Sequence, residues 1–224
     1  MNVWLSPIQH SLIDVFSTLM LFTTILIAEL RRLDASIKSY IAQASLLVAI
    51  FITLGFRYPW FFWWACSATV TKVFLAPWIM LWALRRARYV AETEKPLLPL
   101  PLSIATIIVI YALSAALAYR IALSSHAMAR IGVPPLATAI ALILVGLFVI
   151  STRRNALKQV LGIIMFENGS HVLLASAAFY VPETVEIGIA TDAIVMVVIM
   201  SVLAYIMART KGDMDVSKLT VLRY

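Results

Sequence analysis

The chain has 224 residues, of which 62% are hydrophobic and only 13% are charged, and its mean hydropathy is +0.95. A soluble domain is typically about half apolar and a quarter charged, so this composition predicts an integral membrane protein and excludes an ordinary soluble enzyme. The net charge of +7 does not indicate a nucleic-acid partner, because most basic residues fall in connections on one side of the predicted membrane segments.

Cofactor chemistry is not indicated by the cysteine content. The single cysteine, Cys66, lies in an apolar run and cannot form a disulfide within the chain. The sequence contains neither a CxxC nor an HExxH motif, which are typical of iron–sulfur and zinc sites. We therefore expect no cofactor and no metal site in this chain.

Seven apolar segments are long enough to cross the hydrocarbon core of a bilayer, for which a helix needs about 20 residues. They cover residues 8–30, 39–56, 60–84, 102–123, 134–151, 156–179 and 184–208. Helix-starting prolines such as Pro134 and Pro182 mark the later boundaries. The sequence predicts an all-α, polytopic integral membrane bundle of about seven transmembrane helices without a soluble domain.

The distribution of basic residues predicts the orientation. With the N-terminus outside, thirteen lie on the inner side: Arg31, Arg32, Lys38, Arg85, Arg86, Arg88, Lys95, Arg153, Arg154, Arg209, Lys211, Lys218 and Arg223. Only three, Arg57, Arg120 and Arg130, lie on the outer side. The positive-inside rule then places the N-terminus outside and the C-terminus in the cytoplasm of a multi-pass protein of the cell membrane.

Aromatic residues gather at both ends of the third segment. Trp60–Trp64 forms a cluster at its outer start, and Trp78 and Trp82 lie near its inner end. This placement is typical of the aromatic belts at membrane interfaces, and we assign these residues no further role.

Four ionisable residues lie deep inside the apolar segments: Lys72, Glu167, His171 and Asp192. Each charge at this depth costs roughly 2.5–3.5 kcal/mol on insertion scales, so its retention suggests a function. Lys72 and Glu167 are near the midpoints of their segments, and His171 and Asp192 lie about four residues further out. At about 1.5 Å per residue, this spacing predicts two levels roughly 6 Å apart.

These residue types can relay a proton when they lie within water-bridging distance. Glu167 and His171 are four residues apart and share one helix face. We expect hydroxyls of Ser170, Ser176 and Thr191 to contribute to such a path. The alternative readings are a structural ion pair for Lys72, interhelical contact for Glu167 and simple packing for His171.

Three further residues are secondary candidates. Asp14, in the outer third of the first segment, can also simply reach the lipid headgroups. Glu29 is expected to form an interfacial ion pair with the neighbouring Arg31 and Arg32. Lys158 is expected to extend to the inner surface, and it points away from Glu167 on the same helix.

A stretch near the C-terminus resembles a known family. Gly146-Leu147 is followed, after five intervening residues, by Arg153-Arg154-Asn155, and the next helix carries Gly162 and Glu167-Asn168-Gly169. This pattern resembles the small K-type subunit of respiratory complex I, a lineage that includes the C-type subunit of Mrp sodium/proton antiporters. The similarity extends from Pro134 to Tyr224. In the complex I pattern the buried acid comes two residues after the glycine, where this chain has Ile164.

With four more helices in front, the chain is similar to component E of hydrogenase-4, a membrane subunit of group 4 nickel–iron hydrogenases. The resemblance implies a four-helix extension over residues 1–132 and a K-like three-helix region with a cytoplasmic tail over 133–224. It also implies antiporter-like membrane subunits, hydrogenase and iron–sulfur subunits, and lipids as partners. The expected function is non-catalytic: a contribution to proton translocation, through Glu167, His171 and Asp192, and cohesion of the complex. The alternatives are a purely structural scaffold, a Mrp-type antiporter subunit and a free-standing transporter.

Overall fold

The computed structural model describes residues 5–86, 96–124, 132–177, 183–212 and 214–216, and for residues 177, 183–193 and 211 it describes only the backbone. The described chain is helical, as predicted, and contains no strand longer than an isolated bridge. Its elements are α1 (Pro7–Glu29), α2 (Leu33–Gly55), α3 (Phe61–Ala68), the π-helix η1 (Thr69–Leu75), α4 (Ala76–Arg86), α5 (Leu100–Ser124), α6 (Val133–Thr152), α7 (Ala156–Ala177) and α8 (Glu183–Lys211).

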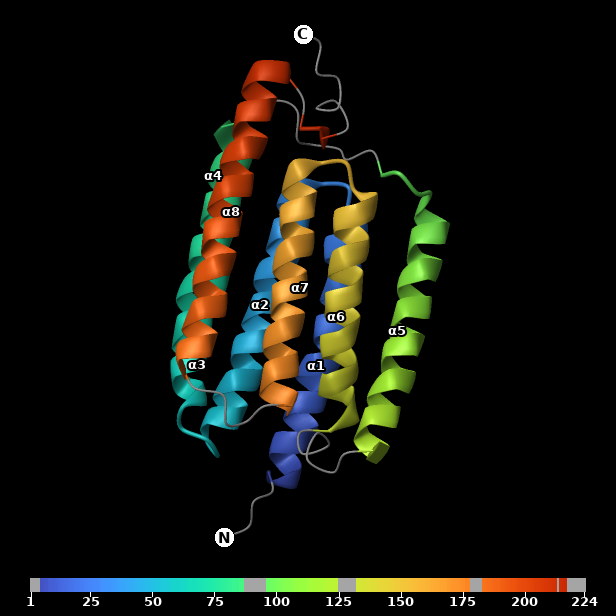
Figure 1. Cartoon of the computed structure of the whole chain (residues 1–224), viewed down its shortest axis with the longest axis vertical. Helices are drawn as coiled ribbons and strands as arrows, with labels where there is room; N and C mark the ends of the chain where they lie inside the picture. Colours follow the sequence, from blue (N-terminus) through green and yellow to red (C-terminus); the bar gives the residue numbers. More distant parts are fainter. Residues whose placement is uncertain (1–4, 87–95, 125–131, 178–182, 213, 217–224) are drawn as a thin grey trace.

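The helices form a bundle whose members run along its long axis, with α3, η1 and α4 stacked end to end as one rod (Figure 1). α7 is the central helix and contacts α1, α2, α6 and α8, whereas α5 lies at one edge against α6 and α1 (Figure 1). We call the end at which α4 and α8 terminate the basic end. Its exposed arginines include Arg31, Arg32, Arg85, Arg86, Arg154 and Arg209.

Five spans are long and apolar enough to cross a membrane by length and composition: α1, α2, the α3–η1–α4 rod, α5 and α6. The predicted multi-pass membrane bundle is thus confirmed. α7 is more polar because it carries Lys158, Glu167 and His171, and its central position surrounds these side chains with protein. Among its described side chains, only Phe166 is more than a third exposed.

The start of the second helix was predicted wrongly. α2 begins at Leu33, six residues before the predicted residue 39. Asp34 and Lys38 made this turn look like a loop, but Leu33, Ser36 and Ile37 are buried, with 0–1% of their surface exposed. A helix can therefore carry charges on its outer face while its inner face continues the core.

The aromatic belt was predicted only partly correctly. Phe61 and Trp64 are buried in the core, where their rings pack against each other at 4.8 Å and both contact Phe51. Trp63 and Trp78, by contrast, are 69% and 66% exposed. The outer cluster therefore serves packing on one helix face and presents aromatic surface on the other.

A π-helical turn interrupts the third rod, and the hydropathy pattern did not indicate it. In η1 the backbone N–H of Ala76 reaches the carbonyl of Thr71, five residues earlier, instead of the usual four. Pro77 follows directly, and a proline ring clashes with the carbonyl four residues before it. The wider π turn relieves this clash. The signal in the sequence was thus a proline inside a long apolar segment.

α6 and α7 pack with their backbones in close approach. A Cβ added at Gly146 would lie 2.7 Å from the carbonyl oxygen of Gly162, and one added at Gly169 would lie 2.8 Å from the carbonyl oxygen of Ala139. Small residues allow such contact between membrane helices. The glycines of the recognised motif therefore set the distance between α6 and α7.

The start of α7 is fixed from two directions. The side chain of Asn155 accepts hydrogen bonds from the backbone N–H groups of Leu157 and Lys158 and acts as a helix cap. The segment Met214–Val216 forms an isolated bridge with this turn, with N–H to O distances of 3.1 and 2.9 Å. The tail after α8 therefore holds α7 in position at the basic end.

Candidate functional site: a buried lysine and its partners

The π-helix η1 carries Lys72, the best-buried charge of the α3–η1–α4 rod. Its side chain is only 3% exposed and points from η1 towards α7. Thr69 and Thr71 on the same turn bond to carbonyls of their own helix, which leaves Lys72 as the group that reaches across. The proline-induced π turn thus positions the ammonium in the interior of the bundle.

Three groups of α7 surround the Lys72 ammonium. Nζ lies 2.7 Å from Oε1 of Glu167, 3.0 Å from Oδ1 of Asn168 and 3.2 Å from Nδ1 of His171. The contact with Glu167 is a buried ion pair between an ammonium and a carboxylate. A lysine ammonium has three N–H donors, and these three acceptors can receive them. We call these four residues the Lys72 cluster.

His171 can exchange one contact for another within the cluster. Its Nδ1 accepts from Lys72 at 3.2 Å, but the same nitrogen is 3.0 Å from the backbone carbonyl of Glu167. A nitrogen without a proton accepts from the ammonium, and a nitrogen with a proton donates to the carbonyl. The geometry therefore accommodates a proton either on Lys72 or on His171.

The cluster continues into a row of neutral amides and hydroxyls. Asn168 donates to Oε1 of Gln43 on α2 at 3.2 Å, and Gln43 donates to Oγ1 of Thr24 on α1 at 2.8 Å. Thr24 in turn donates to the carbonyl of Met20. All the side chains of this row are buried. The row links the Lys72 ammonium to α1 across the bundle.

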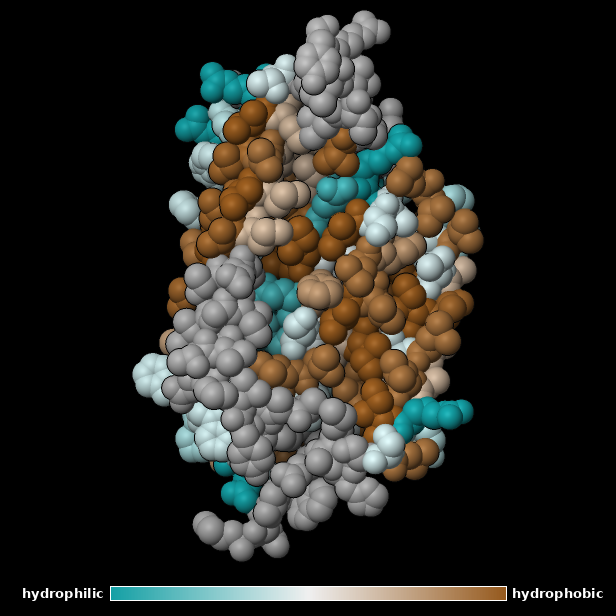
Figure 2. Space-filling model, viewed as in Figure 1, coloured by the Kyte–Doolittle hydropathy of each residue, from teal (hydrophilic) through white to brown (hydrophobic). Residues whose placement is uncertain are grey.

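The Lys72–Glu167 pair borders a small cavity between η1, α7 and α8. The cavity has a volume of about 10 Å³, which is about the least that holds one water molecule. It is lined by Thr71, Lys72, Ala76, Ile164, Glu167, Ile194 and Val197. Figure 2 shows that this face of the bundle is mostly hydrophobic, with hydrophilic residues at its ends and in a hollow near mid-height.

A second polar group lies between the Lys72 cluster and the basic end. Lys158 Nζ donates to the carbonyl of Leu30 at 2.7 Å and to Oγ of Ser36 at 2.8 Å. The expectation that Lys158 extends to the inner surface is wrong, because its side chain is fully buried. The carbonyl of Leu30 lies at the end of α1, where the helix itself supplies no donor, and it accepts from both Lys158 and the hydroxyl of Ser36, the latter at 3.1 Å.

One face of α2 connects the two polar groups. Ser36, Tyr40 and Gln43 follow one another at spacings of four and three residues, so they lie on the same side of the helix. Tyr40 is fully buried, and its hydroxyl receives no hydrogen bond from a described residue and donates none to one. The row therefore runs from Lys158 near the basic end to the Lys72 cluster in the interior.

Glu29 has a different partner from the one expected. Its Oε1 accepts from Arg153 at 2.8 Å and from the hydroxyl of Ser103 at 2.6 Å. The predicted pairing with Arg31 and Arg32 is wrong, because these arginines are exposed whereas Glu29 faces the interior. Arg153, the first residue of the Arg-Arg-Asn motif, is 4% exposed. It thereby ties α6 to α1 and α5.

The remaining candidates do not belong to the Lys72 cluster as far as the described residues reach. Asp14 lies on α1 beside Gly132, with one buried carboxylate oxygen that receives no hydrogen bond from a described residue. Asp192 lies on α8, and its side chain is outside the described residues, as is Thr191. Ser170 and Ser176 bond to carbonyls of their own helix.

Lys72 connects the two predicted levels. The extended lysine side chain spans the expected separation, so Lys72 contacts Glu167 and His171 together. The sequence did not predict the neutral members of the network, because neutral polar residues barely change the hydropathy of an apolar segment. These members are Thr24, Tyr40, Gln43 and Asn168. For Tyr40 and Gln43, the spacing of four and three residues along α2 from Ser36 was the available signal.

The described residues include no group of three or more His, Cys, Asp or Glu side chains placed to hold a metal ion. Cys66 is a free, exposed cysteine. The Lys72 cluster itself consists of buried groups that can act as acids and bases, together with the amide of Asn168.

Comparison with known proteins assigns the C-terminal part of the chain to a class. Residues 134–224 match the family model of NADH-ubiquinone/plastoquinone oxidoreductase chain 4L. This region includes α6, α7 and α8 and contributes Glu167, Asn168 and His171 to the Lys72 cluster. The fold and this match define a multi-pass membrane protein of the respiratory-complex type.

The whole chain has relatives of the same length. It is 37% identical over 216 residues to hydrogenase-4 component E of Escherichia coli (strain K12), and the alignment covers 95% of this chain and 97% of the relative. The same values hold for hydrogenase-4 component E of Shigella flexneri. The chain belongs to the hydrogenase-4 component E family, which confirms the resemblance inferred from the motifs. No solved structure matches the chain.

Proposed function

We propose that this chain is a non-catalytic subunit of a respiratory-type hydrogenase complex in the cell membrane, and that its Lys72 cluster carries protons through the bundle. The observation that carries the proposal is the contact of Lys72 with both Glu167 and His171 in the interior. The printed name of the full-length relatives supports the hydrogenase assignment.

The geometry of the cluster supports short proton transfers. The Lys72 ammonium can pass a proton to the Glu167 carboxylate, whose Oε1 lies 2.7 Å from Nζ, or to Nδ1 of His171, which lies 3.2 Å from Nζ. Each transfer neutralises the lysine, and the acceptor becomes a neutral carboxylic acid or an imidazolium. A proton relay in a low-dielectric medium requires neighbouring groups that can each hold the proton, and here these are Lys72, Glu167 and His171.

A connection to the basic end runs along α2 and α7. Lys158 and Glu167 are nine residues apart, or about 13 Å along the helix, and Ser36, Tyr40 and Gln43 fill this interval on α2. Hydroxyl groups can pass a proton on when they reorient or when a water bridges them. On α8, Asp192 is the proposed continuation towards neighbouring antiporter-like subunits.

We also propose which other subunits the assembly contains. Hydrogenase and iron–sulfur subunits would carry the redox reaction, and the antiporter-like subunits would extend the proton path in the membrane. This chain would hold no cofactor of its own.

The test compares assembly with coupling. Glu167→Gln keeps the size of the side chain but removes its charge. Per assembled complex, we expect about a tenfold loss of proton uptake into inverted vesicles, while the hydrogenase turnover per complex stays unchanged. Asp192→Asn should behave alike. The matched control is Asp34→Asn, an equivalent change at an exposed pair with Arg32. Normal proton uptake per assembled complex in both Glu167→Gln and Asp192→Asn would overturn the relay.

A structural scaffold is the second candidate. It is favoured by the buried contacts that join distant parts of the chain, such as Glu29 with Arg153 and Lys158 with Leu30. In this case Glu167→Gln lowers the amount of complex recovered by affinity purification, and the proton uptake per assembled complex stays normal. Measuring both quantities on the same vesicles separates the two functions.

A further inference from the structure

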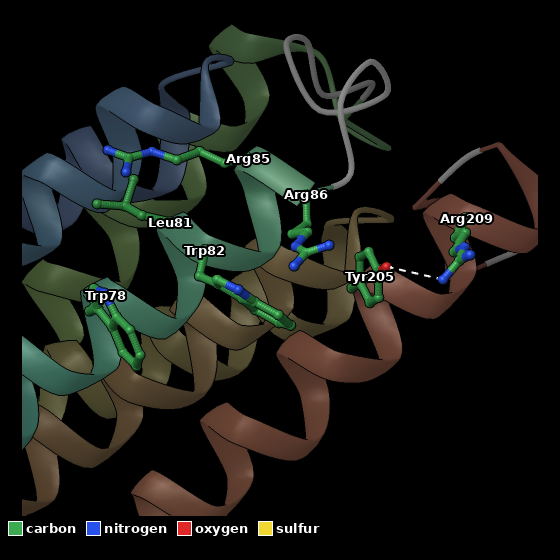
Figure 3. Close-up of a pocket in the computed structure, with 7 residues that line it drawn as sticks. All are labelled: Trp78, Leu81, Trp82, Arg85, Arg86, Tyr205 and Arg209. Carbon is green, nitrogen blue, oxygen red and sulfur yellow. Dashed lines mark hydrogen bonds between the residues drawn. The ribbon is translucent and has the colours of Figure 1, made fainter.

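A large open pocket lies at the basic end, away from the Lys72 cluster. It has a volume of about 720 Å³ and is formed by the last turns of α4 and α8. Seven residues line it: Trp78, Leu81, Trp82, Arg85, Arg86, Tyr205 and Arg209. Figure 3 shows Trp82, Arg86, Tyr205 and Arg209 between the two helices. Arginines and aromatic side chains thus make up nearly the whole lining.

The pocket is strongly positive. Arg85, Arg86 and Arg209 are exposed arginines, and the lining contains no acidic residue among those described. Helix dipoles explain why single cations are stable at the ends of α4 and α8. They do not explain why cations from two helices converge on one cavity. In Figure 3, Arg86 and Arg209 face the space between α4 and α8, whereas the side chain of Arg85 points away from them. Two positive charges that face each other in one concave site favour an anion.

The arginines are held with donors still available. The guanidinium of Arg86 lies 6.0 Å from the centre of the Trp82 ring, and Arg209 donates to the hydroxyl of Tyr205 at 3.4 Å. The rings of Trp82 and Tyr205 are themselves in contact at 5.7 Å. A guanidinium has five N–H donors in a planar fork that suits phosphate. The Trp82 ring therefore orients Arg86 and the Tyr205 hydroxyl orients Arg209, while most N–H donors of both guanidinium groups stay available.

The surface next to the pocket is that of a lipid-facing helix. Val70, Phe74 and Trp78 follow one another every four residues towards the middle of the bundle and are 57–66% exposed. On α8, Val202 and Ile206 continue the exposed apolar surface. A ligand in the pocket can therefore place a charged group on the arginines and apolar chains along these helices.

We propose that this pocket binds the phosphate headgroup of an anionic phospholipid, with the acyl chains along α4 and α8. A soluble anion would use the arginines but not the adjoining apolar surface. A zwitterionic lipid would use the apolar surface but gain little from the positive charges of Arg86 and Arg209. Only an anionic phospholipid uses both, and basic pockets between transmembrane helices are suited to such headgroups.

The test is native mass spectrometry of the full-length chain released from nanodiscs that contain equal amounts of phosphatidylglycerol and phosphatidylethanolamine. The parent chain should retain phosphatidylglycerol preferentially. Arg86→Gln with Arg209→Gln should weaken this retention about 25-fold, at about fivefold for each arginine near the membrane surface. The matched control is Arg31→Gln with Arg154→Gln, which removes two exposed arginines at the same end outside the pocket.

Each outcome has a defined meaning. Equal losses in the two double variants, or no loss in the pocket variant, would overturn the proposal. Arg86→Lys with Arg209→Lys keeps the charges, so retained selectivity for phosphatidylglycerol in this variant would support it and exclude misfolding as the cause of the loss. Inorganic phosphate is added at about 10–20 mM, a concentration on the order of the dissociation constants of weak anion sites. Displacement of the lipid by this phosphate would indicate a free-phosphate site and overturn the proposal.

The same assay distinguishes two protein occupants. Glu92 and Glu94 follow Arg86 in the sequence, and replacing both with glutamine should leave lipid retention unchanged. A several-fold increase would identify the chain's own acids as the occupant and overturn the proposal. Loss of the lipid from the intact complex, together with a crosslink from Arg86→Cys to an acidic segment of another subunit, would overturn it in favour of a protein interface.

Discussion

The pairing of Lys72 with Glu167 makes a quantitative prediction. Lys72→Met leaves the carboxylate beside a cavity of about 10 Å³, which cannot hydrate an ion. The folded chain must then protonate Glu167. An ordinary glutamate has a pKa near 4.3, so its neutralisation at pH 7 costs about 3.7 kcal/mol. In Glu167→Gln the buried lysine must lose its proton, which costs about 4.6 kcal/mol from an ordinary pKa near 10.4.

The two single variants should respond to pH in opposite directions. In Lys72→Met the folded chain holds one proton more than the unfolded chain, so its free energy of unfolding falls as the pH rises above about 4.3. In Glu167→Gln the folded chain holds one proton fewer, so its deficit shrinks as the pH rises towards about 10.4. The slope in each case is about 1.4 kcal/mol per pH unit.

The double variant, Lys72→Met with Glu167→Gln, should recover most of the lost stability. It leaves no unpaired charge in the interior, and replacing a buried pair by uncharged side chains is often close to neutral. The assay is thermal unfolding of the purified full-length chain in one detergent at pH 5.5, 7 and 8.5. Tryptophan fluorescence reports it, since Trp64 is 1% exposed in the folded chain.

Two results would refute this reasoning. Additive losses in the double variant would mean that Lys72 and Glu167 do not interact. Parallel pH trends in the single variants would mean that the remaining charge keeps its water, and that the site is open to solvent in the folded chain.

Three further predictions concern the parts of the fold that position the cluster. Glu29→Gln leaves the Arg153 guanidinium buried without its carboxylate and should cost roughly 3–5 kcal/mol in thermal unfolding. Gly162→Val places a side chain 2.9 Å from the carbonyl oxygen of Gly146, and it should cost about 3 kcal/mol through separation of α6 and α7. Asn155→Ala removes the cap of α7 and should cost about 1 kcal/mol, visible as faster hydrogen exchange in its first turn.

Each of these variants has a matched control. Asp34→Asn neutralises an exposed acid and should cost less than about 1 kcal/mol. Ser151→Val enlarges an exposed position of α6 and should be tolerated, so an equal loss there would contradict the close-approach argument for Gly162. Asn155→Asp keeps a capping oxygen, and faster exchange in this variant as well would show that the cap is not the cause.

The sequence alone determined which segments are helices and which charges are expensive. Apolar runs of about 20 residues predict membrane-spanning helices directly, because each residue contributes to the free energy of insertion through its own hydropathy. For the same reason the depth of Lys72 and Glu167 could be read along their segments. The motif around Arg153, Asn155 and Gly162 indicated the family before the geometry was known.

The tertiary structure decided which charges meet. Glu29 and Arg153 are 124 residues apart in the sequence, and Lys158 and Leu30 are 128 residues apart. No local sequence pattern specifies such pairs. The π turn at Lys72 depends on a backbone clash at Pro77, which hydropathy does not register. Burial depends on the neighbours that a folded chain supplies, and for this reason the surroundings of Lys158 and Glu29 were predicted wrongly from local pattern alone.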